Sequence, residues 1–254
     1  MKFIESKENS LIKKFRSLSV KKYREQFSLF KIEGEKVVLE SLKIDGVVEN
    51  VLIDADYIAN YNNIIEKYND KVLVIKHEIF EKLSETVVPQ HIMAICNMKK
   101  HEINIASISK LLVLDRLQDP GNLGTIIRSA VASGFYDIVL IDSVDPYNDK
   151  TLRSASGTIF YPRFYSMSVE EFISLTDEFN ITIVIAEAGK QSVFDKNLTL
   201  PTKFALVIGN EGNGVEKAIR EQKHLSLSIP MNSEVESLNA GVSASILMFM
   251  LSNR

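Results

Sequence analysis

Residues 204–222 read FALVIGNEGNGVEKAIREQ: an apolar run, a glycine-rich loop and then a helical pattern. The run is typical of a buried strand, and the glycines between Gly209 and Gly214 allow the backbone to pass close to a ligand. The same letters are consistent with a tight turn alone, because Asn-Gly is a common hairpin dipeptide. A strand, a loop and a helix in this order predict one unit of an α/β fold.

The same alternation runs through the rest of the chain. After residue 110, the strand-like segments LLVLD, DIVLID, ITIVIAEA and LSLSIPM alternate with helical patterns, which predicts a parallel sheet covered on both faces. Residues 34–97 show a shorter alternation, and a polar stretch follows it. We therefore expect an α/β protein with a smaller N-terminal α/β domain at 1–97, a linker at 98–108 and a C-terminal parallel-sheet domain at 109–254.

Composition excludes several classes of protein. No apolar stretch is long enough to span a bilayer, and the opening MKFIESKENS lacks the apolar segment of a signal peptide. The single cysteine, Cys96, cannot form an internal disulfide, and the four histidines show no metal-ligand spacing. We expect a cytoplasmic protein that uses no metal and no membrane.

The N-terminal segment is basic although the whole chain is mildly acidic. The net charge of the chain is -3, whereas residues 1–31 carry nine basic and three acidic side chains, a balance of +6. Leu11, Ile12, Phe15 and Leu18 recur at helical spacing, so the segment is predicted to form an amphipathic helix. A local basic helix favours phosphate contacts, and the alternative interpretation is a solvated helix face. The candidate RNA-binding side chains are Lys13, Lys14, Arg16, Lys21, Lys22 and Arg24.

Three loops follow predicted strands, at the sheet edge where α/β proteins bind ligands. In the first, DRLQDPGNLGTIIRSA, Asn122 is placed to cap a helix that carries Arg128. The second is the glycine-rich loop, whose G-x-x-G-x-G order differs from the dinucleotide fingerprint and whose Glu211 would repel a phosphate. The third, IPMNSEVESLNAGVSASI, leads into a helix that begins with small residues. Taken singly, each loop is also explained by a surface arginine, a tight turn or ordinary helix packing.

In this order the loops resemble the three motifs of the SpoU/TrmH family of RNA ribose 2′-O-methyltransferases, within the SPOUT class. The matching residues are Asn122, Arg128, Gly209 to Gly214, Ile229, Ser237, Leu238 and Asn239. Residues 1–97 resemble the family's small substrate-binding domain. The resemblance covers essentially the whole chain and implies a C-terminal domain with a trefoil knot, a rare exception to unknotted topology.

The resemblance implies S-adenosylmethionine as cofactor and transfer of its methyl group to a ribose 2′-hydroxyl. It implies that the cofactor is bound by Gly209, Asn210, Gly212, Gly214, Ile229 and Leu238. It also gives Arg128 a central role at the hydroxyl, and we expect electrostatic stabilisation because a guanidinium rarely releases a proton. The other expected catalytic residues, which position Arg128 and the ribose, are Asn122, Glu211, Ser237 and Asn239.

The separate N-terminal domain resembles that of ribosomal-RNA-directed members, which favours 23S ribosomal RNA, with guanosine as a common family choice. Two alternatives are a transfer-RNA 2′-O-methyltransferase and a catalytically inactive RNA-binding or ribosome-assembly protein. A nucleotide-binding oxidoreductase is disfavoured by the glycine order. The C-terminal helix NAGVSASILMFMLSN is apolar around most of its circumference, which predicts burial by its own sheet or by a second subunit. The resemblance implies a homodimer through the C-terminal domain.

Overall fold

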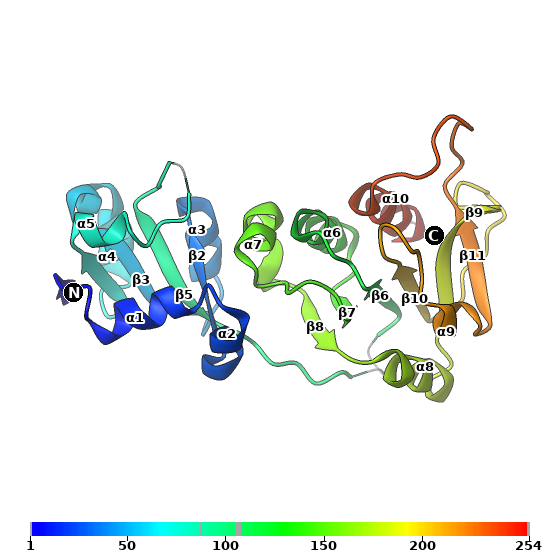
Figure 1. The fold of residues 1–254 in the computed structure, drawn as a ribbon, viewed down its shortest axis with the longest axis horizontal. Helices are drawn as coiled ribbons and strands as arrows, with labels where there is room; N and C mark the ends of the chain where they lie inside the picture. The colour runs from blue at the N-terminus through cyan, green and yellow to red at the C-terminus, as the bar shows by residue number, and fades with distance from the viewer. Residues whose placement is uncertain (1, 87, 105–107, 253–254) are drawn as a thin grey trace. The chain divides into compact units, whose positions relative to one another are not determined.

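The computed structural model describes residues 2–86, 88–104 and 108–252, and Figure 1 shows the order of its elements. The chain divides into two compact units. The first unit is Met1–Lys99 with Tyr147–Leu152, and the second is Lys100–Pro146 with Arg153–Arg254. The linker expected at 98–108 lies partly outside the described residues.

The first unit is built on a mixed five-stranded sheet. The strand order is β1-β4-β3-β5-β2, and β5 is antiparallel to both of its neighbours. The strands are β1 (Lys2–Ile4), β2 (Leu29–Glu33), β3 (Val48–Asp54), β4 (Val72–Ile75) and β5 (Ile92–Asn97). The helices are α1 (Ser10–Ser17), α2 (Lys21–Phe27), α3 (Glu35–Leu42), η1 (Ala55–Tyr61), α4 (Asn62–Lys67) and α5 (His77–Phe80). The sequence pattern predicted β3, β4 and β5 but neither β1 nor β2.

Two short helices, α1 and α2, replace the single amphipathic helix expected in the basic segment. The side chains of Ile12, Phe15 and Leu18 are buried in the core of this unit, as their spacing predicted. The apolar repeat ends at Leu18, and the chain turns there before α2 begins. Helix α2 buries only Arg24, so the core gives it no reason to continue α1.

The second unit is built on a six-stranded sheet with every neighbouring pair parallel, which confirms the predicted sheet. The strand order is β11-β9-β10-β6-β7-β8. The strands are β6 (Lys110–Asp115), β7 (Asp137–Ile141), β8 (Arg163–Ser166), β9 (Thr182–Ser192), β10 (Phe204–Ile208) and β11 (His224–Ser228). The helices are α6 (Pro120–Ser133), η3 (Thr158–Phe160), α8 (Val169–Glu178), α9 (Lys217–Arg220) and α10 (Ala240–Ser252), and α7 (Asp149–Ala155) is divided between the two units at Leu152. Strand β8 was not predicted, because RFYS is short and carries little alternation.

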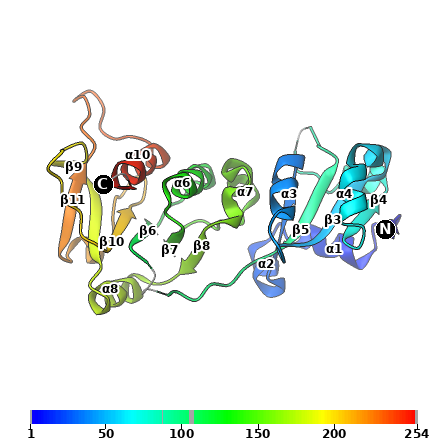
Figure 2. The ribbon, with the colours of Figure 1, turned by 180° about the vertical axis from the view of Figure 1, so that it is seen from behind.

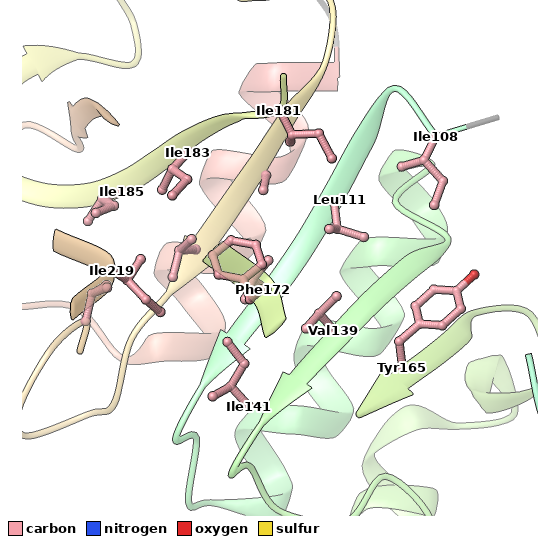
Figure 3. Packing of buried hydrophobic residues seen from close by; sticks show 14 residues of the cluster. Ile108, Leu111, Val139, Ile141, Tyr165, Phe172, Ile181, Ile183, Ile185 and Ile219 are labelled. Carbon is pink, nitrogen blue, oxygen red and sulfur yellow. The ribbon is translucent and has the colours of Figure 1, made fainter. Parts of the chain in front are cut away.

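Helices cover both faces of this sheet. On one face, strand residues such as Leu111 and Val139 pack with Phe172 of α8 and Ile219 of α9, as Figure 3 shows. On the other face α6 and α10 lie side by side in both views (Figures 1 and 2). Burial on both faces explains why the strands read as continuous apolar runs instead of alternating ones.

The order of the strands reverses beside β6. The chain runs outward from β6 through β7 to β8, and then returns to place β10 on the other side of β6. The loops after β6 and β10 therefore diverge from adjacent carboxyl ends, where parallel sheets form a ligand-binding crevice. The trefoil knot implied by the resemblance stays a prediction. Among the described residues no helix is both long and apolar enough to cross a membrane.

Candidate functional site

Helix α6 begins one turn earlier than the sequence pattern indicated. Its N-cap is Asp119, whose Oδ1 accepts a hydrogen bond from the backbone N–H of Asn122 at 2.8 Å. Pro120 occupies the first helical position, where its missing N–H costs nothing. The expectation that Asn122 caps this helix was therefore wrong. The Asn122 amide instead points its donor and its acceptor at the other two loops.

The Asn122 side chain joins all three loops. Its Nδ2 donates to Glu211 Oε1 at 3.0 Å, and its Oδ1 accepts from Asn239 Nδ2 at 2.9 Å. Asn239 Oδ1 in turn accepts from the backbone N–H of Gly241 at 2.9 Å, in the first turn of α10. Three of the five predicted catalytic residues therefore form one hydrogen-bonded chain, which we call the Asn–Glu–Asn chain (Asn239, Asn122 and Glu211).

Glu211 is held at the N-terminus of α6. Its carboxylate accepts from the backbone N–H groups of Gln118 and Asp119, each at 3.3 Å, as well as from Asn122. Partial burial would raise the pKa of Glu211, but these three hydrogen bonds outweigh it and lower the pKa below its usual value. Glu211 is therefore an anion at neutral pH, and the helix N-terminus favours that charge.

The glycine-rich loop closes on itself. Asn210 and Gly214 exchange two backbone hydrogen bonds of 3.0 Å, so Gly214 lies directly against Gly209. A Cβ on Gly209 would lie 2.3 Å from the carbonyl carbon of Gly214, which leaves room only for glycine. A Cβ on Gly212 would meet no atom closer than 3.7 Å. Gly209 is therefore needed because the two ends of the loop come so close together there, and this close approach determines the shape of the loop.

Asn210, predicted to bind the cofactor, uses its side chain inside the loop. Its Oδ1 accepts from the backbone N–H groups of Gly212 and Asn213, both at 3.0 Å, and its Nδ2 donates to the Arg116 carbonyl at 2.8 Å. Because its backbone also pairs with Gly214, Asn210 shapes the loop through both its side chain and its backbone.

Asp115 and Arg116, which the sequence pattern did not single out, tie the loops after β6 and β10 together. The buried Asp115 carboxylate accepts from the backbone N–H of Glu216 at 2.6 Å. Arg116 donates to the Gly214 carbonyl at 3.2 Å and pairs with Glu216 at 2.7 Å. The signal that could have found them is a charged pair at the end of the central strand. The two residues hold the glycine-rich loop against the central strand.

Two cavities share Ala186 and Glu187, from the middle of β9, in their walls. The larger, of about 350 Å³, includes Gly214 in its lining. The smaller, of about 150 Å³, includes Ile229, Ser237 and Leu238. Three predicted residues thus line the smaller cavity and Gly214 lines the larger one, whereas Gly209 and Gly212 line neither cavity.

Glu187 is a lining residue that the sequence pattern did not single out. Its Oε1 pairs with Arg220 at 3.0 Å, and its Oε2 accepts from Ser226 Oγ at 2.7 Å. The hydrogen bond from Ser226 is the main cause that lowers the pKa of Glu187, so the carboxylate is charged at neutral pH. Its position at the end of the strand ITIVIAEA was the available signal. The charged side chains in the lining of the smaller cavity are Glu187 and Glu236, both acidic.

Arg128 lies on the exposed side of α6, in the third turn. Among the described residues nothing pairs with its guanidinium, and it lines neither of the two cavities. The adjacent face of α6 packs on α10 through small residues: Ser129 and Ser245 share a hydrogen bond of 2.7 Å. A Cβ on Gly241 would meet Thr125 at 3.3 Å. The close approach predicted from the small residues of α10 is therefore an approach to α6.

The predicted RNA-binding side chains, all in the first unit, differ in exposure. Lys13, Arg16, Lys21 and Lys22 are exposed, and Lys14 is half-buried beside Glu49. Arg24, in contrast, is 4% exposed and donates to the Leu18 carbonyl at 2.7 Å. Arg24 anchors α2, and its inclusion in an RNA-contacting surface was wrong.

Metal ligands are not gathered anywhere in the described part of the chain: no group of three or more His, Cys, Asp or Glu side chains there could hold an ion. Cys96 is buried in β5, and burial raises the pKa of its thiol. A buried, protonated thiol is a poor nucleophile, so the cysteine contributes packing alone.

Comparisons with known sequences agree on one kind of protein. Residues 109–249 match the SpoU rRNA Methylase family, and residues 9–94 match the MRM3-like substrate binding domain. The chain is similar to the 23S rRNA (guanosine(2553)-2'-O)-methyltransferase RlmP of Bacillus subtilis (strain 168), with 35% identity over 99% of both chains. It is 28% identical to an uncharacterized tRNA/rRNA methyltransferase of Synechocystis sp., over 97% of this chain and 92% of that protein.

Solved structures share the fold over both units. A putative RNA methyltransferase of the TrmH family from Porphyromonas gingivalis superposes with a TM-score of 0.82 and 27% identity, over 97% of this chain and 98% of that one. An AdoMet-bound rRNA methyltransferase from Sinorhizobium meliloti superposes with a TM-score of 0.85 and 24% identity, over 99% of this chain and 97% of that one.

Proposed function

Because the chain belongs to the SpoU rRNA Methylase family, we propose that it transfers a methyl group from S-adenosylmethionine to a ribose 2′-hydroxyl of ribosomal RNA. The expected fold class, a parallel-sheet SPOUT domain with a smaller N-terminal α/β domain, is confirmed. The observation that carries the proposal is the Asn–Glu–Asn chain, because it joins three loops that a mere binding fold has no need to join. The relative in B. subtilis modifies a guanosine of 23S rRNA, and we propose the same class of target here.

The lining of the smaller cavity fits S-adenosylmethionine. That cofactor carries a positively charged sulfonium, and the cavity offers the carboxylates of Glu187 and Glu236 beside apolar Ile229 and Leu238. The same carboxylates would repel the pyrophosphate of a nicotinamide dinucleotide, which disfavours an oxidoreductase. We propose that Ile229, Leu238 and the exposed backbone of Gly214 hold the cofactor, with Gly209, Asn210 and Gly212 shaping the loop.

The bound cofactor supplies a methyl group on an electrophilic sulfonium, and the protein must make the ribose oxygen a better nucleophile. As the 2′-hydroxyl gives its proton to solvent water, negative charge grows on its oxygen. The guanidinium of Arg128 donates hydrogen bonds to that oxygen and stabilises the charge. Its exposure, with no ion pair to any described residue, leaves it available for this contact.

We propose a positioning role for the remaining polar residues. The Asn–Glu–Asn chain fixes the starts of α6 and α10 relative to the glycine-rich loop. Ser237 lies in the wall of the smaller cavity, from which its hydroxyl can orient the ribose. Small displacements of such groups are costly, because methyl transfer requires the reacting atoms in line.

The two units have separate tasks in this proposal. We assign substrate binding to residues 1–97, a linker to 98–108 and methyl transfer to 109–254. The two family models, over residues 9–94 and 109–249, support this division. A ribosomal RNA substrate also supports a cytoplasmic location.

The RNA-contacting surface of the first unit is proposed to contain Lys13, Lys14, Arg16, Lys21 and Lys22. Reversing the charges of Lys13, Lys21 and Lys22 should weaken RNA binding and flatten its dependence on salt, because fewer counterions are released. Cofactor affinity should not change. If RNA affinity and salt slope are both indifferent to the reversal, the helix face is only solvated.

We further propose a homodimer formed through α10. The helix buries Gly241, Ala244, Leu247, Met248 and Leu251 in its own unit. Its opposite side exposes Val242 (45%) and Phe249 (43%), two turns apart along the same stripe. Exposed apolar side chains in register along a helix are typical of an interface between subunits. Light scattering should give the mass of a dimer, and Phe249→Lys should give a monomer.

A mixture of two inactive variants tests which subunit's cofactor Arg128 serves. Arg128→Ala lacks the guanidinium, and Gly209→Ala distorts the loop that shapes the cofactor site, so each is nearly inactive alone when the cofactor is kept well below the dissociation constant of Gly209→Ala. If Arg128 acts on the partner's cofactor, a mixed dimer contains one intact site and recovers activity. If it acts on its own, the mixture stays inactive.

The main experiment maps ribosomal RNA by mass spectrometry in a strain that lacks the protein. Loss of one 2′-O-methylated nucleotide in 23S rRNA, restored by the wild-type chain but not by Arg128→Ala, is the expected result. An unchanged set of ribosomal nucleotides, with a methyl group missing from a transfer RNA, would refute the choice of substrate.

A further inference from the structure

Helix α2 (Lys21–Phe27; Figure 1) buries a charged side chain and exposes aromatic ones, the opposite of an ordinary surface helix. Its buried side chain is Arg24, whereas Tyr23 (38%) and Phe27 (39%) are exposed. A surface helix normally turns its aromatic residues to the core and its charges to water. Packing among the described residues of the first unit therefore gives no reason for the outward position of the two aromatic rings.

The two rings form one surface. Tyr23 and Phe27 lie four residues apart on one side of α2, with ring centroids 6.3 Å apart and planes inclined by 16°. The Lys14 ammonium lies 5.7 Å from the centre of the Phe27 ring and pairs with Glu49 at 3.2 Å. We call these two rings the aromatic platform; a cation from α1 lies at its edge.

The surroundings of the aromatic platform are basic. Lys21 and Lys22 belong to the same helix and are exposed, and Lys13 and Arg16 are exposed on α1. The acidic residue of α2, Glu25, lies 3.7 Å from Lys21 and offsets one charge. The cores of protein interfaces are depleted of charge, and lysine in particular is rare there, so a protein partner is disfavoured. Exposed aromatic faces among lysines are the combination that binds single-stranded nucleic acid.

We propose that Tyr23 and Phe27 stack on unpaired bases of the RNA substrate, with Lys14, Lys21 and Lys22 contacting the adjacent phosphates. The inference rests on the proposed function, which supplies RNA as the partner. It narrows the substrate to a loop, bulge or open strand, because the bases of an A-form duplex are stacked on one another and closed to a protein ring.

The chain contains no tryptophan, so Phe27→Trp introduces a single fluorescent reporter into the aromatic platform. An unpaired RNA oligomer should quench its emission and bind as tightly as it binds the wild type. The same strand annealed to its complement should bind at least about tenfold more weakly and quench little, because stacking on each base is lost.

Alanine variants separate stacking from charge. Tyr23→Ala and Phe27→Ala should each lower affinity for the unpaired RNA about tenfold and leave the salt slope unchanged, because no counterion is involved. Lys22→Ala should instead reduce the salt slope by about one. Phe27→Leu keeps an apolar side chain of similar size without a π face, and it should lose as much affinity as Phe27→Ala. Phe179→Ala, at an equally exposed position (38%) in the second unit, is the control and should bind normally.

The outcomes distinguish this inference from the proposed function. If the unmodified chain binds and methylates RNA but binds duplex RNA as tightly as the open strand, the proposal that bases stack on the aromatic platform is refuted and the proposed function is unaffected. Equal affinity of Phe27→Ala, Phe27→Leu and wild type would refute the aromatic platform in the same way. If the unmodified chain neither binds RNA nor transfers a methyl group to it, the proposed function fails and this inference fails with it.

Discussion

Each unit carries a cluster of polar side chains at the carboxyl ends of adjacent parallel strands. In the first unit Asp54 ends β3, and its Oδ2 accepts from Nδ1 of His77 at 2.8 Å and of His91 at 2.9 Å. In the second unit the Asn–Glu–Asn chain lies at the ends of β6 and β10. By position alone, both are candidate sites.

The two clusters differ in what they leave exposed. Asp54 is fully buried and satisfied by both imidazoles, and the Tyr57 ring stacks on His91. Glu211 and Asn239 are exposed, and the loops that carry the Asn–Glu–Asn chain also contribute walls to two cavities. We infer that the first cluster stabilises its unit and that the second serves a ligand. A polar cluster at the carboxyl ends of parallel strands therefore indicates a ligand-binding site only when it keeps exposed polar groups and lies beside a cavity.

The largest expected effect comes from Arg128. Arg128→Ala should lower the rate of methyl transfer by about 10²–10³, the usual cost of removing one group that stabilises a developing oxyanion. Cofactor affinity and the melting temperature should stay within error, because the side chain is exposed and has no ion pair to a described residue. Single-turnover kinetics and calorimetry make the measurements. Arg128→Lys keeps the charge but not the planar fork, and it should recover only part of the rate.

Gly209→Ala and Gly212→Ala form a matched pair within one loop. The first places a Cβ 2.3 Å from the Gly214 backbone and must move the loop, so cofactor affinity should fall by about tenfold to a hundredfold. The second meets nothing closer than 3.7 Å and should bind nearly as the wild type does. Equal affinities, measured by titration calorimetry, would mean that the loop does not shape the cofactor site.

A substitution in the polar cluster of the first unit should lower the stability of that unit and leave cofactor affinity unchanged. Asp54→Asn removes a buried charged acceptor shared by two histidines, and it should lower the free energy of unfolding of that unit by about 1–3 kcal/mol. Scanning calorimetry follows the unfolding of the unit. Should Asp54→Asn instead weaken cofactor binding with unchanged stability, the distinction between the two clusters would be lost.

The smallest expected effects are opposite responses to pH. The hydrogen bond to Asp54 raises the pKa of His77, so its contribution to stability is full below about pH 6.5 and fades as pH rises through the raised value. The pKa of Glu211 is lowered, so its contribution is full above about pH 4.3 and fades as pH falls through the lowered value. Melting temperatures of His77→Gln and Glu211→Gln, each compared with wild type from about pH 2 to about pH 9, should converge with wild type at opposite ends of the range. Convergence at the same end would contradict one of the two assignments.

The sequence predicted the second unit well because its strands are buried on both faces and its helices are separated by turn residues. It also predicted that Asn122, Glu211 and Asn239 belong to one site, through their loops. It missed that Asp119 caps α6, because Asp119 and Asn122 are both good capping residues and only the backbone conformation distinguishes them. It also missed β8 and the pair Asp115 and Arg116, whose partners lie in distant parts of the chain.

The first unit was harder to predict. Strands β1 and β2 are three and five residues long and lie at the sheet edges, so they carry little pattern. The basic segment showed which of its apolar residues enter the core, but its charges did not show which side chains face outward. Arg24 reads like its basic neighbours, and only the contact with the Leu18 carbonyl reveals that it is buried.

The hydrogen bond between Asn122 and Asn239 has a consequence for the order in which a newly made chain gains its abilities. The two residues are 117 positions apart in sequence. At about 5–20 residues per second, roughly 6–23 s of synthesis separate them. Once Leu152 has been made, the first unit is complete and free to fold, while Asn122 still lacks its partner. A nascent chain is therefore expected to display its proposed RNA-contacting surface for several seconds before it holds a finished methyl-transfer site.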